Sequence, residues 1–241
     1  MALVDRIGLH IIKRGVIGKG FRGVSGFKGF GAVGIISALH LVNSLKMERI
    51  GIITTKYHPE YVYRDDYGIA YPFEIFASKE NKLVVFVTRE IPDERIRDEY
   101  VYEITKFAAK YGISPLVLIG GLDKKFKNKE DEKMRWLKNS YYRGESIDAE
   151  ELEKGLLIIG PLALQLMYSE LLKVPAIVLL PYANAETPDP AAAATAIEAL
   201  NKLFSLSIDN SKLIEEGKMI EEEIKKLEEI AASRAGKEPY M

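Results

Sequence analysis

Short apolar runs that alternate with segments of helical spacing constrain the fold of this chain more than any other feature of its sequence. The apolar runs are FRGVS (21–25), RIGIITT (49–55), YPFEIFAS (71–78), KLVVFVTRE (82–90), PLVLIGG (115–121), GLLIIG (155–160) and VPAIVLLPY (174–182). Between them, residues 32–46, 101–111, 161–172 and 190–204 repeat apolar side chains at helical spacing. This alternation predicts a three-layer α/β fold, in which a mostly parallel sheet carries helices on both faces.

We expect one large domain and a short tail. The 241 residues are enough to bury a core, so the predicted α/β domain covers residues 1–234 and a flexible tail covers 235–241. The charge run within residues 122–152 interrupts the pattern. We interpret it as a solvated excursion from the sheet, with some helix around Met134 and Leu137.

The last long helix, at about 211–234, differs from the others in its apolar spacing. Its apolar seam is narrow and consists of Leu213, Gly217, Ile220, Ile224, Leu227 and Ala231. Two seam positions in every seven residues are typical of a helix that packs on a partner helix. A terminal helix that lies on its own sheet is the alternative.

Composition excludes several classes of function. The chain has no cysteine, so disulfides, thiolate nucleophiles and cysteine-bound zinc are excluded. A net charge of −1 gives no reason to expect nucleic acid or an anionic membrane as a partner. Asp5, Arg6 and His10 interrupt the first residues, where a signal peptide needs an apolar run, and we expect a cytoplasmic protein. A single glutamine among many Lys and Glu residues suits a thermophile.

The stretch GFKGFGAVG (26–34) is the one motif that suggests a ligand. Gly29, Gly31 and Gly34 match the G-x-G-x-x-G spacing of dinucleotide-binding turns. However, Lys28 interrupts the approach to the first glycine, and the second strand ends without the carboxylate that binds a ribose. We therefore interpret the glycines as a tight strand-to-helix turn, and keep a nucleotide or nucleoside ligand as the alternative.

Other candidate chemistry is weaker. His58 stands near Glu60, Asp65 and Asp66 in KYHPEYVYRDDYG, a tyrosine-rich stretch that is better read as a loop or an interaction surface than as a metal site. No serine stands in a G-x-S-x-G motif, and Asp189 between two prolines is explained as a helix cap. The sequence predicts no enzyme, no cofactor and no metal.

Several segments together resemble the proteasome assembly chaperone family, in its archaeal branch. They are GFKGFGAVG, LIGG (118–121), IIGPLALQL (158–166), VPAIVLLPYANAETPDPAAAATAIEAL (174–200) and IEEEIKKLEE, and they cover about residues 21–230. The resemblance implies a non-catalytic assembly chaperone, or an activator-like adaptor, that binds the proteasome core particle at its α-subunits.

The resemblance also gives a meaning to the end of the chain. Archaeal members and proteasome activators often end in a hydrophobic residue, a tyrosine and any residue, which insert between subunits of the core particle. The matching residues are Pro239, Tyr240 and Met241. A free carboxylate can pair with a lysine, and several tails on one homo-oligomer gain by effective concentration. An oligomeric scaffold that sequesters its tail and binds another partner remains a further alternative.

Overall fold

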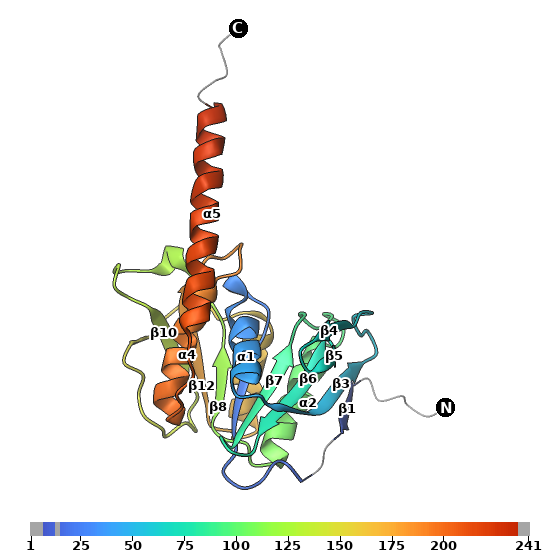
Figure 1. Ribbon diagram of the computed structural model, residues 1–241. Helices are drawn as coiled ribbons and strands as arrows, with labels where there is room; N and C mark the ends of the chain where they lie inside the picture. Colours follow the sequence, from blue (N-terminus) through green and yellow to red (C-terminus); the bar gives the residue numbers. More distant parts are fainter. Residues whose placement is uncertain (1–6, 13–14, 236–241) are drawn as a thin grey trace.

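In the computed structural model, which describes residues 7–12 and 15–235 and only the backbone of 225–235, ten strands form one sheet (Figure 1). The strands are β1 (Ile7–Ile11), β2 (Arg22–Gly26), β3 (Glu48–Thr55), β6 (Phe73–Ser78), β7 (Leu83–Thr88), β8 (Leu116–Ile119), β9 (Leu122–Asp123), β10 (Met134–Lys138), β11 (Glu150–Glu151) and β12 (Ala176–Ala183). Their order is β1-β3-β6-β7-β2-β8-β12-β10-β11, and β9 pairs with the end of β12. A separate hairpin consists of β4 (Tyr63–Asp65) and β5 (Gly68–Ala70).

The centre of the sheet is parallel, as the sequence predicts. Strands β7, β2, β8 and β12 run in the same direction, and every residue of β7, β8 and β12 is buried. The consecutive runs 71–78 and 82–90 form a hairpin, because β6 and β7 pair antiparallel. This hairpin separates β3 from β2, so the strands on either side of the first long helix are not neighbours. The fold class is confirmed.

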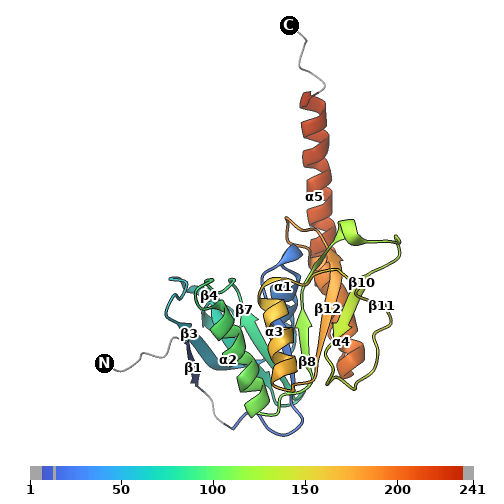
Figure 2. The same cartoon turned by 180° about the vertical axis from the view of Figure 1, so that it is seen from behind.

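Helices cover both faces of the sheet (Figures 1 and 2). On one face, α1 (Val33–Ser44) and α4 (Pro190–Phe204) enclose one apolar core together with the sheet. On the other face, α2 (Arg97–Lys110) and α3 (Gly160–Leu171) enclose a second one. Short 3-10 turns, η1 (Phe30–Ala32) and η2 (Lys124–Phe126), lie in loops.

Two local predictions are wrong. Residues 155–159 form a loop, in which Leu157 is 83% exposed and Ile159 69% exposed. Their run finds no place beside β12, because β8 and β10 already pair with its two sides. The helix expected around Met134 and Leu137 is instead strand β10, antiparallel to β12. Met134 and Trp136 alternate along β10 and are buried on one face, as in a strand. Because charged residues surround them in the sequence, this alternation was not recognised.

The terminal helix α5 (Ser211–Ala235) leaves the body of the protein after two turns. Leu213 is buried in the core under α4, and a Cβ on Gly217 would lie 2.9 Å from the Cβ of Ala191, so that α5 and α4 touch closely there. Beyond this contact the helix extends away from the sheet (Figures 1 and 2). Of the seam residues up to Ile224, Leu213 and Gly217 are therefore covered by the domain, whereas Ile220 and Ile224 are only half-buried. The domain limits 1–234 and 235–241 stay a prediction.

Candidate functional site

The loops that leave the carboxyl ends of the parallel strands form the candidate site. In open α/β sheets this edge is where ligands and partners bind. The glycine turn follows β2, Arg89 and Glu90 follow β7, Gly120 and Gly121 follow β8, and residues 184–189 follow β12. Helix α5 rises on the same side of the molecule (Figure 1). We call this set of loops the carboxyl edge.

The glycine turn is filled by the protein itself. A Cβ on Gly26 would lie 2.0 Å from the carbonyl oxygen of Gly34, and a Cβ on Gly34 would lie 2.5 Å from that of Ile119. Gly31 has a φ of 61°, in the left-handed region. The first turn of α1 therefore lies directly on β2 and β8, as a tight strand-to-helix turn requires.

A ligand role for Gly29, Gly31 and Gly34 stays a prediction that this packing does not favour. In a dinucleotide fingerprint the pyrophosphate approaches the second glycine, here Gly31, and in this structure the segment after β12 packs there instead. A Cβ on Gly31 would meet the Cβ atoms of Ala183 and Asp189 at 2.7 and 3.0 Å. Of Gly29, Gly31 and Gly34, only Gly29 has open space where a Cβ atom would lie.

Asp189 joins four segments of the carboxyl edge. Its carboxylate accepts hydrogen bonds from the backbone N–H groups of Ala192 and Asn184, both at 3.0 Å, and forms an ion pair of 2.9 Å with Lys124. Its own N–H donates to the carbonyl oxygen of Gly31 at 2.8 Å. Burial opposes the ionisation of Asp189, but these hydrogen bonds and Lys124 outweigh it and lower its pKa. The predicted helix cap is confirmed, and it also holds the glycine turn.

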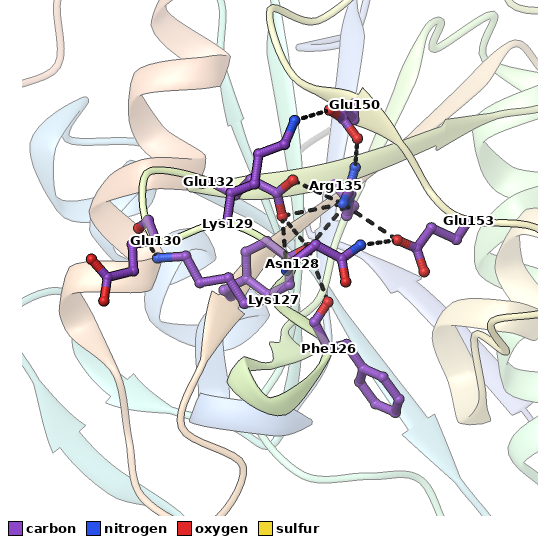
Figure 3. A network of polar contacts seen from close by, with 10 residues as sticks. Phe126, Lys127, Asn128, Lys129, Glu130, Glu132, Arg135, Glu150 and Glu153 are labelled. Carbon is purple, nitrogen blue, oxygen red and sulfur yellow. Dashed lines mark hydrogen bonds and ion pairs between the residues drawn. The ribbon is translucent and has the colours of Figure 1, made fainter.

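A buried arginine ties the charged segment to the sheet (Figure 3). The side chain of Arg135, on β10, is 2% exposed and forms ion pairs with Glu132 at 3.0 Å, with Glu150 on β11 and with Glu153 at 3.5 Å. Its Nε also donates to the hydroxyl of Tyr182, on β12, at 2.9 Å. We call these five residues the Arg135 cluster.

The hydrogen bonds of the Arg135 cluster also favour the charged forms of Arg135 and Glu150. The hydrogen bond with Glu150 raises the pKa of Arg135, and hydrogen bonds from Arg135 and then Lys129 lower the pKa of Glu150. Strands β9, β10 and β11 thus tie parts of the charged segment 122–152 to the sheet at β12, and these parts are not a solvated excursion. Sequence reasoning missed Arg135 because its partners are up to 47 residues away in the chain. The alternation of Met134 and Trp136 with charged residues was the available signal.

The tyrosine-rich segment folds over a second charge cluster. Glu74 on β6 is fully buried and pairs with Arg89 at 3.1 Å and Arg49 at 2.8 Å. Tyr67 donates to Glu74 at 3.0 Å, and its hydroxyl and that of Tyr63 contact Arg89. This contact network holds the β4–β5 hairpin on the sheet.

Several large apolar side chains are exposed on the hairpin and just before it. Tyr61, Val62, Tyr63 and Ile69 are exposed there. This exposure agrees with the interpretation of the tyrosine-rich stretch as an interaction surface.

His58 does not join its acidic neighbours in the sequence. Its ring lies edge-on to Phe73 with the ring centres 5.3 Å apart, and burial lowers its pKa. Asp65 instead faces Arg89, at 3.7 Å. Within residues 7–12 and 15–235 no group of three or more His, Asp or Glu residues could hold a metal ion. Over the same residues, no helix has the length and the apolar character needed to span a bilayer.

The predicted partner-binding residues Pro239, Tyr240 and Met241 lie outside the described residues. The structure does show where the chain leads before them. From Gly217 to Ala235 the helix continues for about 27 Å at 1.5 Å per residue, away from the carboxyl edge. The end of α5 thus lies far from the domain core.

Comparison with known proteins gives one family and a set of similar folds. The model of the PAC2 family matches residues 23–228. An uncharacterized protein of Methanocaldococcus jannaschii is 28% identical over 230 residues, which are 90% of this chain and 87% of that protein.

Among solved structures, PbaA of Pyrococcus furiosus, an archaeal homolog of proteasome-assembly chaperone, has a TM-score of 0.80 at 21% identity. The match covers 97% of this chain and 96% of PbaA. PbaB of the same organism, an archaeal proteasome activator, has a TM-score of 0.75 at 22% identity, and the match covers 92% of this chain and 99% of PbaB. These matches confirm the α/β fold, and with the family model they confirm the resemblance found in the sequence.

Proposed function

Since this chain belongs to the PAC2 family, we propose that it is a non-catalytic adaptor of the proteasome, an assembly chaperone or an activator, that binds the α-subunits of the core particle through Pro239, Tyr240 and Met241. The observation that carries the proposal is the position of α5. A tail attached to the far end of a projecting helix is accessible to a partner, whereas a tail attached to the domain surface competes with its own core.

The tail is too short to bind to the domain of its own copy. Residues 236–241 extend at most roughly 20 Å, at 3.3–3.6 Å per residue. The helix between Gly217 and Ala235 is about 27 Å long. A tail that starts at the end of α5 is therefore too short to return to the carboxyl edge of its own domain. This argument favours the adaptor over the scaffold with a sequestered tail.

We propose further that copies of the chain associate through α5. Leu213 and Gly217 are covered by α4, while Ile220 and Ile224 continue the seam along the helix and are only half-buried. Apolar residues on a projecting helix are stabilised by a partner helix. Association would place several tails at one end of the oligomer, where each bound tail raises the effective concentration of the next.

The decisive experiment is a binding assay with purified core particle. We compare the full chain with Tyr240→Ala, with a variant that lacks residues 239–241, and with Glu238→Ala as a matched control next to the motif. Tyr240→Ala and the truncation should no longer co-sediment with the core particle, because the aromatic contact and the terminal carboxylate are lost. Glu238→Ala should bind like the unaltered chain. Equal binding by all four proteins would refute the tail mechanism.

Calorimetry separates the adaptor from a nucleotide- or nucleoside-using enzyme. Ala183 and Asp189 pack against Gly31, the glycine at which the fingerprint admits a pyrophosphate, so we expect no heat of binding with ATP, NAD or nucleosides at millimolar concentration. A saturable signal that Phe30→Ala or Lys28→Ala alters would contradict the non-catalytic assignment.

A further inference from the structure

A hollow lined by lysines opens beside the base of α5. It has a volume of about 280 Å³ and lies between the segment around η2 and the first turns of α4. Ala191 forms part of its wall and is also the residue that Gly217 of α5 contacts, so the hollow adjoins α5 directly. We call it the lysine hollow, and its charged residues are Lys124, Lys127, Glu132, Lys133 and Asp189.

Both acidic residues of the lysine hollow are already paired within the domain. Asp189 caps α4 and forms its ion pair with Lys124. The carboxylate of Glu132 accepts hydrogen bonds from Arg135, at 3.0 and 3.1 Å, and from the hydroxyl of Tyr182, at 3.1 Å. These two carboxylates therefore do not neutralise the remaining two lysines of the hollow.

The remaining two lysines, Lys127 and Lys133, carry positive charge that the domain leaves largely uncompensated. Lys127 donates a hydrogen bond to the backbone carbonyl oxygen of Glu130 (Figure 3), and it forms no ion pair among the described side chains. Lys133 lies 3.9 Å from Glu198, and 71% of the lysine side chain is exposed. An ion pair of this length and exposure contributes little. The hollow thus offers two cations to a partner with negative charge.

Glutamates flank the seam of α5 at the level where the helix leaves the domain. Glu216 precedes Gly217 and Glu221 follows Ile220, so one acid stands on either side of the seam. In a heptad they occupy the g and e positions, which face each other when two such helices pack in parallel. Parallel packing of α5 by itself would bring Glu216 of one copy beside Glu221 of the next, and like charges destabilise such a contact. These positions need cations from another element.

A second helix that packs on the seam of α5 lies over the lysine hollow. Gly217 rests on Ala191, and Ile220 and Ile224 continue the same side of α5 away from the sheet. The segment around η2 rises on the same side of the molecule as α5 (Figures 1 and 2). A helix on Ile220 and Ile224 therefore stands above the N-terminus of α4, where the hollow opens.

We propose that the lysine hollow of one copy receives α5 of a second copy, and that Lys127 and Lys133 pair with the glutamates beside its seam, Glu216 and Glu221. This inference rests on the association through α5 and adds to it a contact between helix and domain. Charge complementarity identifies the occupant, because the acids that repel each other between parallel helices are those that the lysines can neutralise. The contact also favours parallel helices, which carry all tails to one end.

Charge reversal tests the contact in the full chain, with sedimentation velocity over a range of concentrations as the readout. Lys127→Glu with Lys133→Glu should weaken the association roughly tenfold, because attractions at each interface become repulsions. The matched control is Lys106→Glu with Lys110→Glu, which changes the net charge equally but on α2, at the other face of the sheet. The control should associate like the unaltered chain, and calorimetry verifies that each variant is folded.

The reciprocal change supplies a readout that a general loss of stability cannot give. Glu216→Lys with Glu221→Lys should weaken the association on its own. Combined with Lys127→Glu and Lys133→Glu, it should restore most of the affinity, because the same pairs form again with exchanged signs.

The outcomes separate this contact from the proposed function. Equal association of the hollow variant and its control would refute the contact and leave the association through α5 in place. A folded fourfold variant that recovers no affinity would refute the pairing with these glutamates. An unaltered chain that stays monomeric at every concentration would overturn both the contact and the association, whereas binding of the tail to the core particle is measured independently of them.

Discussion

Replacement of Asp189 by alanine should destabilise the carboxyl edge more than any other loss of a single helix cap. The change removes the N-cap of α4, which costs about 1 kcal/mol. It also leaves the N–H of Asn184 without its acceptor, which costs about 1–3 kcal/mol where the group is buried. The ion pair with Lys124 adds little, because the lysine side chain is 49% exposed.

These contributions sum to about 2–4 kcal/mol in the free energy of unfolding. For a domain of this size, we expect the Tm to fall by roughly 4–16 °C, measured by differential scanning calorimetry. The matched control is Asp209→Ala, which removes an exposed acceptor of the N–H of Ser211 at the start of α5. Its Tm should change by only a few degrees.

The dependence on pH supplies an independent check. Because the pKa of Asp189 is lower in the folded state, its contribution to stability is present above the pKa of the unfolded chain, near 4, and is lost as pH falls through the folded-state pKa. The difference in Tm between the unaltered chain and Asp189→Asn should therefore shrink as pH falls below about 4. A Tm of Asp189→Ala within one or two degrees of the control at neutral pH would refute the reasoning.

Three further predictions concern the packing and the charge clusters. Gly26→Ala should greatly reduce soluble expression, because its Cβ would lie 2.0 Å from the carbonyl oxygen of Gly34, whereas Gly29→Ala, with open space, should express normally. The buried amide of Gln165 has no hydrogen-bond partner among the described residues, so Gln165→Leu should raise the free energy of unfolding by about 1–2 kcal/mol, measured by urea denaturation. A lower urea midpoint for the variant would show that the amide is hydrogen-bonded. As pH falls through the lowered pKa of Glu150, its contribution to holding β11 on β10 should be lost, so the protection of the amides of residues 150 and 151 against hydrogen exchange, relative to an unfolded chain at the same pH, should fall. Protection that Arg135→Met leaves unchanged would contradict the role of Arg135.

Sequence patterns predicted those parts of the fold that depend on local periodicity. The hairpin of β6 and β7, the parallel strands β8 and β12 and the cap at Asp189 follow from runs and turn residues that act over a few positions. The place of β3 does not, because the chain alone does not say that a later hairpin inserts between β3 and β2. GLLIIG shows the same limit, since a run of apolar residues becomes a strand only where an edge is free.

The candidate site was predictable only in part. Gly26 and Gly34 could be assigned to a tight turn, because close backbone approach is a known use of glycine. The Arg135 cluster could not, since Arg135 and Tyr182 meet only after β10 and β12 have paired. The charge run looked solvated because a sequence shows charges but not which of them find a buried partner.

The length of the projecting helix α5 sets both the distance of its end from the domain and the direction in which the chain continues. Each residue of a helix adds about 1.5 Å of length and turns the following segment by about 100°. Deletion of seven residues from the exposed part of α5 would shorten the arm by about 10 Å and nearly restore its heading. Deletion of two would barely shorten it but would swing the end of the chain to the opposite side. The length of α5 therefore sets distance and orientation together, and only steps of about seven residues change the distance at a nearly constant orientation.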